Sequence, residues 1–400
     1  MNLTSQTAGQ VTNVVIIWAV YAVTHSALDV AIVGVVSAIS TVGVTLPAGV
    51  WVDRYNRYLL LLSTNAVRVV CLGLLALLTE AYGFQLVVVI AIVTVWSAAG
   101  ELFRSTNYSI LPDLVNQNEV ANANGVTQSG TQLVGSASNV LGGALVIVAG
   151  AALAFVYGAA GFALAAILST FLFYRSRTSN PQSKPETQKQ RMMGREIKEG
   201  FRWLIAQRGF FQLSVSAVAF NFLFGLTNYF LVIYVSVALH AGAFLFGAVL
   251  ASSVIGGALG SLLVGRTNAI AHAGKVWILV YGAVSGSLLL LLGLVTVPVV
   301  ALVANFGIGF AGGFAGIVWL TAAQNLVPAP MRGRYFAIDG LLSFIGGPPS
   351  IAAGGILITL IGVVHVFELG GVLMLVFAAV FAVMRSLWML DGRPRPDISY

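Results

Sequence analysis

Long runs of apolar residues, separated by short polar stretches, recur along the whole chain. Each run is about 20 residues long, the length that an α-helix needs to cross the hydrocarbon core of a bilayer. The pattern predicts an all-α membrane protein with twelve transmembrane helices. Their expected ranges are 3–23, 30–51, 58–79, 84–104, 121–147, 148–174, 209–238, 243–265, 275–296, 298–321, 334–360 and 364–386.

The composition argues against a water-soluble globule. Hydrophobic residues make up 58% of the 400 residues and charged residues only 8%, whereas a soluble domain carries about 25% charged residues. So few polar side chains cannot cover the surface of a globule of this size. The 44 glycines instead suit helices that pack closely in lipid.

The net charge of +7 raises the question of a nucleic-acid partner, but the positions of Lys and Arg favour a membrane topology. If the N-terminus is cytoplasmic, none of the predicted outer loops contains a Lys or Arg. This positive-inside pattern predicts a protein of the cytoplasmic (inner) membrane with both termini inside and no nucleic-acid partner. The cationic residues cluster on the predicted inner side, at 54–57, 175–208, 266–275, 332–334 and 385–395.

A polar segment divides the chain into two halves of six predicted helices. Its first part is rich in Pro, Ser, Gln and Lys and is typical of a flexible linker, whereas Ile197, Phe201, Leu204 and Ile205 predict an amphipathic helix on the inner membrane surface. The expected domains are a helix bundle at 1–174, a linker at 175–208, a second bundle at 209–388 and a tail at 389–400.

The two halves show signs of an internal repeat. The stretches "GSASNVLGGALV" (135–146) and "GPPSIAAGGILI" (347–358) share Gly, Ser, Gly-Gly and Leu at matching positions, and the same offset places Arg54 on Arg266. The repeat predicts two pseudo-symmetric six-helix bundles with a binding site between them near the bilayer midplane.

The stretch "GVWVDRYNR" between the second and third predicted helices carries a charged motif in Gly49, Asp53, Arg54 and Arg57. With six plus six helices and a basic linker, this motif resembles that of the major facilitator superfamily. The stretches "ILPDLV" (110–115), "EVANANG" (119–125) and "MRGRYFAI" (331–338) resemble its drug and siderophore exporter branch, which includes macrolide and enterobactin exporters. The resemblance implies a monomeric secondary transporter in membrane lipid that exports a small amphipathic or hydrophobic compound by alternating access, in exchange for protons.

The charged motif also has a physical interpretation. Asp53 lies at the inner end of a predicted helix, where its carboxylate can face the positive N-terminus of a neighbouring helix. Arg57 can pair with Glu101, near the inner end of the fourth helix. We expect Gly49, Asp53, Arg54, Arg57 and Glu101 to form a latch that closes the inner side. The alternative is that these charges only mark the topology of a solvated loop.

Two departures from the exporter pattern weaken the expectation of proton coupling. Gln10 follows Gly9 at the point where these exporters usually carry an acidic residue. Ser138 and Asn139 stand where a Gly-Pro pair is usual, although Gly142 and Gly143 follow as expected. A uniporter or an importer of another small solute therefore stays open as an alternative.

Ionisable residues inside predicted helices are rare and mark functional sites by default. Arg68 lies deep in the third helix and can pair with Glu101 or face a water-filled cavity. Arg104 lies three residues after Glu101, so these two can neutralise each other.

Asp339 and Glu368 are the other acids at predicted membrane depth. Asp339 follows Arg332 and Arg334, which favours structural neutralisation, but it is also the best remaining site for proton coupling. Glu368 follows His365 by three residues and is either a snorkelling carboxylate or half of a protonatable pair.

Uncharged polar residues in the predicted helices indicate a substrate cavity. Amides in lipid need hydrogen-bond partners, so the alternative is that they hold helices together. A cavity of amides and aromatic rings with few charges favours a bulky, mostly apolar or weakly polar ligand. The expected lining residues are Asn13, Trp96, Gln128, Gln132, Asn139, Asn221, Phe224, Asn228 and Asn305.

The sequence indicates no cofactor, no metal site and no enzymatic centre. The four histidines are spread along the chain, Cys71 is the only cysteine, and the glycine-rich stretch "GFAGGFAG" (309–316) lacks the Lys of a phosphate-binding loop. Two rivals from other classes stay open, namely an intramembrane enzyme that acts on lipid and a membrane receptor that does not transport.

Overall fold

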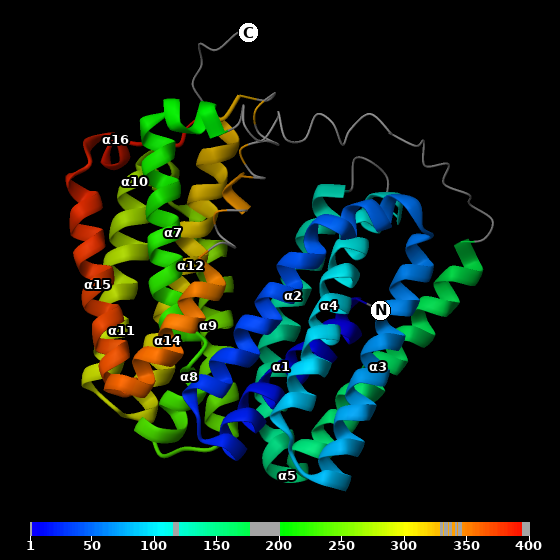
Figure 1. The fold of residues 1–400 in the computed structure, drawn as a ribbon. Coiled ribbons are helices and arrows are strands. Elements are labelled where there is room, and N and C mark those ends of the chain that lie inside the picture. The colour runs from blue at the N-terminus through cyan, green and yellow to red at the C-terminus, as the bar shows by residue number, and fades with distance from the viewer. Residues whose placement is uncertain are drawn as a thin grey trace. The chain divides into compact units, whose positions relative to one another are not determined.

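The computed structural model describes residues 2–114, 120–176, 201–328, 331, 335, 338–340, 342 and 346–393. These residues are mostly helical, and no strand occurs among them (Figure 1). Several predicted features lie outside them, namely the linker from 177 to 200, Arg332, Arg334 and the tail from 394 on. The side chains of Asp53, Gln128 and Gln132 also lie outside the described part, although their backbones are helical.

In the described part of the chain, ten helices are long and apolar enough to cross a bilayer. This number makes the protein a multi-pass membrane protein, and the expected number of twelve spans stays a prediction. One of these ten segments covers 38 residues of α5. This helix is interrupted at Gly150, where the backbone φ is 74°. Only glycine adopts this conformation readily, and the break falls where the sequence predicts the junction between two spans.

The described residues form two compact units, the first made of residues up to 176 together with 230–251, the second made of 201–229 and the residues from 252 on. The first unit contains α1 (Asn2–Thr24), α2 (Ala27–Arg54), α3 (Arg57–Tyr82), α4 (Leu86–Leu114), α5 (Val120–Ser176), α8 (Leu231–Ile233) and η2 (Tyr234–Ala238). The helix α9 (Ala243–Leu263) begins in the first unit and ends in the second.

The second unit holds the remaining helices. They are α7 (Arg208–Asn228), η3 (Val264–Arg266), η4 (Ala269–His272), α10 (Ala273–Val276), η5 (Trp277–Val284), α11 (Ser285–Leu294), α12 (Pro298–Leu326), α14 (Gly347–Ile361), α15 (Val363–Val383) and α16 (Arg385–Trp388). The predicted span 209–238 is therefore not one regular helix, because α7 ends at Asn228 and a turn at Tyr229 and Phe230 precedes α8.

In the first unit, α1 and α3 both pack against α5, while α4 packs against α2 and α3 (Figure 1). Small residues permit the close approach of α1 to α5. Gly161 of α5 lies against Ala8, and Gly158 lies against Thr12. Such small-residue contacts are the usual means by which helices associate in lipid.

In the second unit, α9 and α12 approach each other at backbone distance. A Cβ atom on any of four glycines would overlap a backbone carbonyl of the opposite helix, so only glycine fits there. Ser261 of α9 also donates a hydrogen bond of 3.3 Å to the carbonyl oxygen of Gly313. The four glycines are Gly256 and Gly260 of α9 and Gly309 and Gly313 of α12.

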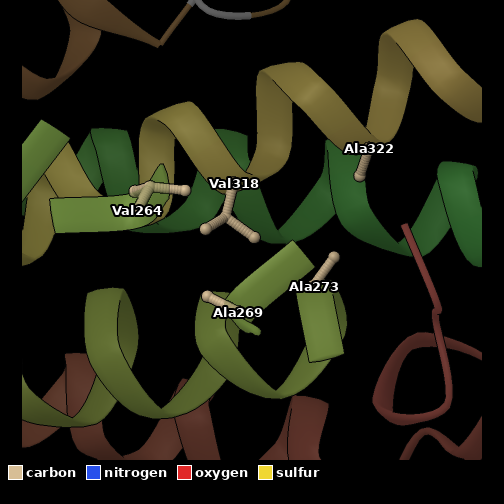
Figure 2. Packing of buried hydrophobic residues seen from close by; sticks show 5 residues of the cluster. All are labelled: Val264, Ala269, Ala273, Val318 and Ala322. Atoms are coloured by element: carbon tan, nitrogen blue, oxygen red, sulfur yellow. The ribbon is translucent and has the colours of Figure 1, made fainter. Parts of the chain in front are cut away.

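One end of α12 packs against the short helices that follow α9. Figure 2 shows small side chains of α12 facing η3, η4 and α10. Their small size allows the short helices to lie close to α12 and buries the cluster. The buried members are Val264, Ala269, Ala273, Val318 and Ala322.

The end of the predicted amphipathic helix is helical at 201–206. Leu204 is buried, whereas the neighbouring Ile205 is 59% exposed. The ring of Trp203 contacts the rings of Phe210 and Tyr335, at centroid distances of 5.9 and 6.2 Å. These contacts attach the segment to the second unit, and its position on the membrane surface stays a prediction.

Candidate functional site

A cavity of about 230 Å³ lies among α1, α3 and α4 of the first unit. The residues that α1 contributes follow one helical face, because their spacing repeats every three to four positions. They are Ser5, Gln6, Gly9, Gln10 and Asn13. The rest of the lining comes from α3 and α4 and consists of Arg68, Trp96, Gly100, Phe103 and Arg104.

Arg68 lines this cavity and is only 7% exposed. Its Nη1 donates a hydrogen bond of 3.3 Å to the hydroxyl of Ser5, which itself donates to Oδ1 of Asn65 at 3.0 Å. The guanidinium carbon lies over the rings of Phe103 and Phe162, 5.0 Å from each centroid. Four helices therefore hold Arg68 in place, since Phe162 belongs to α5.

Gly100 makes room for the guanidinium group. A Cβ at this position would lie 2.8 Å from Nη2 of Arg68, which is shorter than a van der Waals contact. Any larger residue at position 100 would therefore push on the guanidinium group. The absence of a side chain here leaves room for the guanidinium group of Arg68.

The structure places Glu101 with Arg104 rather than with Arg57 or Arg68. Arg104 donates from Nε to Oε2 at 2.9 Å and from Nη2 to Oε1 at 2.8 Å, a bidentate geometry that is among the strongest in proteins. Both residues lie on one face of α4, three positions apart. The expected pairs between Glu101 and the two other arginines are therefore wrong for the described structure.

Two buried donors at the cavity lack a hydrogen-bond partner among the described residues. They are Nε of Arg68 and Nε1 of Trp96. A cation–π contact is worth about 0.5–2 kcal/mol, whereas placing an Arg at the centre of a membrane helix costs about 2.5–3.5 kcal/mol on insertion scales. The rings offset part of this cost, and the two donors stay without a hydrogen bond from the described residues.

Gly49, Asp53 and Arg54 of the predicted latch lie near the end of α2, and Arg57 starts α3. Glu101 lies in the middle of α4, so its expected place near the end of the fourth helix is wrong. Arg57 donates from Nη1 to the carbonyl oxygen of Ser109 at 3.0 Å, which ties the start of α3 to α4. Arg54 is the exposed last residue of α2, and a Cβ added at Gly49 would meet no other atom within 4 Å. The role of these residues as a latch stays a prediction.

Among the predicted cavity residues whose side chains the structure describes, Asn13 and Trp96 line the cavity and the others do not. Asn305 is buried and donates from Nδ2 to the carbonyl oxygen of Ala301 at 3.0 Å, in its own helix. Asn139 is buried, and its carbonyl oxygen lies against Gly247 of α9.

The predicted stripe on α7 lies in the second unit. Asn221 accepts a hydrogen bond of 2.9 Å from the hydroxyl of Tyr281, whose ring also packs against Phe220. Phe224 and Asn228 of the same helix are half-buried. This bond joins α7 to η5. Asn221 therefore links two helices, which is the alternative to lining a substrate cavity.

Several cavity residues were missed from the sequence, namely Ser5, Gln6, Gln10 and Phe103. A signal for the first three was available, because they fall on the same face of α1 as Gly9 and Asn13. In the sequence, Gln10 stood out only as the place of a missing acid.

The two remaining membrane acids lie elsewhere. Nδ1 of His365 lies 3.0 Å from Oε2 of Glu368 near the start of α15. Asp339 is half-buried in a helical stretch at 338–340. Among the described residues, no group of three His, Cys, Asp or Glu side chains is arranged to hold a metal ion.

Comparisons with known proteins extend these observations. A family model described as Major Facilitator Superfamily matches residues 1–350. A relative from Bacillus subtilis (strain 168), named "Uncharacterized MFS-type transporter YvqJ", is 22% identical over 286 residues, which cover 71% of this chain and 67% of the relative.

Solved structures of transporters share the fold. A bacterial homologue of the human lysosomal transporter Spinster has a TM-score of 0.68 at 16% identity and covers 99% of this chain and 98% of its own. A bacterial homologue of the iron transporter ferroportin has a TM-score of 0.70 at 16% identity, with coverage of 95% and 96%. A POT family transporter in complex with 5-aminolevulinic acid has a TM-score of 0.72 at 13% identity, with coverage of 96% and 94%.

Proposed function

We propose the following transport function for this chain, which belongs to the Major Facilitator Superfamily. It is a transporter of this family and a multi-pass membrane protein. We propose that it is a secondary transporter that exports a small amphipathic compound by alternating access. The cavity among α1, α3 and α4 is its substrate site or part of it.

The observation that carries this proposal is the chemistry of the cavity lining. Amide side chains of Gln6, Gln10 and Asn13 stand with the aromatic rings of Trp96 and Phe103 around one space of about 230 Å³. Small-molecule sites combine apolar and aromatic surface with a few placed polar groups in this way. The export direction is supported by the sequence resemblance to the exporter branch.

The energy source that we propose is proton antiport, with Asp339 as the coupling acid. A coupling acid must gain and lose a proton during the cycle, and Glu101 is already paired with Arg104. Asp339 is half-buried in an otherwise apolar segment, a setting in which its protonation can change when the inner gate opens.

A second candidate function is uniport or solute exchange without protons. Among the residues that line the described cavity, none is Asp or Glu, and Gln10 occupies the position where exporters of the resembling branch usually carry an acid. This lining favours a mechanism in which the substrate alone drives the conformational change.

The proposed topology has twelve helices in two six-helix bundles, with both termini on the inner side of the cytoplasmic membrane. The break of α5 at Gly150 supports counting that helix as two spans, and the apolar helix Gly347–Ile361 supports one more. We further propose that the protein works as a monomer.

The test is transport in proteoliposomes with a panel of labelled drugs, siderophores and lipids, with and without a pH gradient. Antiport predicts uphill movement of at least one compound that depends on the gradient and is abolished by a protonophore. Downhill movement that no pH gradient alters would establish the uniport alternative. Liposomes without protein serve as the control for passive permeation.

A further inference from the structure

We infer that the cavity among α1, α3 and α4 binds an organic anion, whose carboxylate or phosphate group contacts Arg68. This inference rests on the proposed transport function for the assignment of that anion as cargo. The sequence favoured a mostly apolar or weakly polar ligand, whereas the inferred ligand carries a negative charge.

The charges around the cavity are the first argument. Two cations line it, Arg68 and Arg104. The charge of Arg104 is already balanced by Glu101 through two hydrogen bonds of 2.8 and 2.9 Å. Arg68 has no carboxylate partner among the described residues, so the lining carries one uncompensated positive charge.

The surroundings of Arg68 are the second argument. Its described partners are the neutral hydroxyl of Ser5 and the rings of Phe103 and Phe162. These contacts position the guanidinium group and leave its Nε without an acceptor. A buried cation that is rigidly positioned but not neutralised is suited to receive an anion, because guanidinium N–H groups match the oxygens of carboxylate and phosphate.

The remaining donors are the third argument. The indole Nε1 of Trp96 is buried without a partner in the described structure, and an indole can only donate. Arg68 and Trp96 line the same space, and none of the described residues in its lining carries a carboxylate. This distribution favours acceptors on the ligand and disfavours a ligand with a positive charge.

The size of the cavity sets the shape of the ligand. About 230 Å³ is somewhat below the roughly 300–1,000 Å³ of typical small-molecule sites. It admits an anionic head group with a short apolar body next to Trp96 and Phe103. A carboxylate and a phosphate monoester present the same kind of acceptor oxygens, so the experiment must distinguish them.

The test measures binding of four eight-carbon probes to the full chain in nanodiscs by isothermal titration calorimetry. Octanoate and octyl phosphate carry the two anions, octanamide is the neutral analogue of octanoate, and octylamine carries a positive charge. Inorganic phosphate tests for a site that needs no apolar body. Empty nanodiscs give the background from partition into lipid.

The unmodified protein is expected to bind octanoate or octyl phosphate more tightly than octanamide and octylamine, and the tighter of the two anions identifies the head group. In Arg68→Gln, the affinity for that anion should fall by about tenfold or more, the usual effect of removing a charged hydrogen-bond donor. Arg68→Lys should retain part of it. Arg266→Gln removes an exposed charge of the second unit and should bind like the unmodified protein.

Several outcomes would overturn the inference. They are equal binding of octanoate and octanamide, tighter binding of octylamine, inorganic phosphate that binds as well as octyl phosphate, and an anion affinity that Arg68→Gln leaves unchanged. The comparison of probes on the unmodified protein stands even if Arg68→Gln does not fold. Arg68-dependent binding of the anion without its transport in proteoliposomes would refute its assignment as cargo and leave the anion site intact, whereas the absence of transport for every compound of the panel would refute the proposed function itself.

Discussion

The close crossing of α9 and α12 predicts that Gly→Ala destabilises the protein at Gly313 but stabilises it at Gly316. At Gly313, a Cβ would overlap the backbone carbonyl of Gly257, whereas at Gly316 nothing lies within 4 Å of it. Both glycines lie in α12, so Gly→Ala improves the helix propensity by about 0.5–1 kcal/mol at either one. Only Gly313→Ala adds the cost of forcing the two helices apart.

The difference between the two variants isolates that cost, because the gain in propensity cancels. Overpacking costs typically about 1–3 kcal/mol, and backbone atoms cannot rotate away as a side chain can. If each kcal/mol shifts the melting temperature by roughly 2–4 °C, the variants should melt about 2–12 °C apart, with Gly313→Ala the lower.

The assay is thermal unfolding in detergent, followed by the fluorescence of the seven tryptophans, one of which is Trp319 of α12. A thiol-reactive dye gives a second reading, because the only cysteine, Cys71, is buried in the folded protein. Equal melting temperatures for Gly313→Ala and Gly316→Ala would refute the backbone-contact geometry of this crossing.

Three further predictions concern the site and the coupling. Gly100→Ala should weaken octanoate binding severalfold, because the new Cβ would stand 2.8 Å from Nη2 of Arg68. Gly73→Ala on α3 is the control, because nothing lies within 4 Å of a Cβ there, and it should leave the affinity unaltered. Equal affinities of the two variants in calorimetry would contradict the role of Gly100. Asp53→Asn should leave the protein folded but weaken the inner latch, since a carboxylate that faces the positive N-terminus of a neighbouring helix contributes about 0.3–1 kcal/mol. Maleimide labelling of Asn13→Cys should become faster in this background, and an unaltered rate with normal expression would argue against the latch. Asp339→Asn should abolish pH-driven uphill transport in proteoliposomes while downhill exchange continues, and uphill transport that persists would exclude Asp339 as the coupling acid.

The helices could be predicted from the sequence because their signal is local. A run of about 20 apolar residues has few alternatives to a spanning helix, and the predicted junction between 147 and 148 lies beside the actual break at Gly150. The turn at Tyr229 and Phe230 could not be predicted, since neither Pro nor Gly marks it. The π-helical stretch Trp277–Val284 likewise carries no sequence signal.

The cavity could be predicted only in part, because its geometry depends on contacts between distant segments. The rings around Arg68 come from α4 and α5, 35 and 94 positions along the chain, and periodicity within one helix cannot indicate which helices meet. The choice of Glu101 between Arg104 and Arg68 was likewise open in sequence. Spacing of three residues permitted the pair with Arg104, and the structure places those two side chains together.

The central claim is that the cavity among α1, α3 and α4 holds the transported compound, and protection of an introduced cysteine tests it most directly. Asn13 lines the cavity and is exposed to its space, and the native Cys71 is buried and gives little background. Asn13→Cys is labelled with a maleimide in the presence of increasing amounts of a compound that the proteoliposome panel has shown to be transported. Thr267→Cys, at an exposed position of the second unit, is the control for changes in reagent access. The account predicts that the compound slows labelling at position 13 with a midpoint near its transport KM and leaves labelling at position 267 unaltered. A compound that is transported at saturating concentration while position 13 is labelled at its original rate would contradict the account.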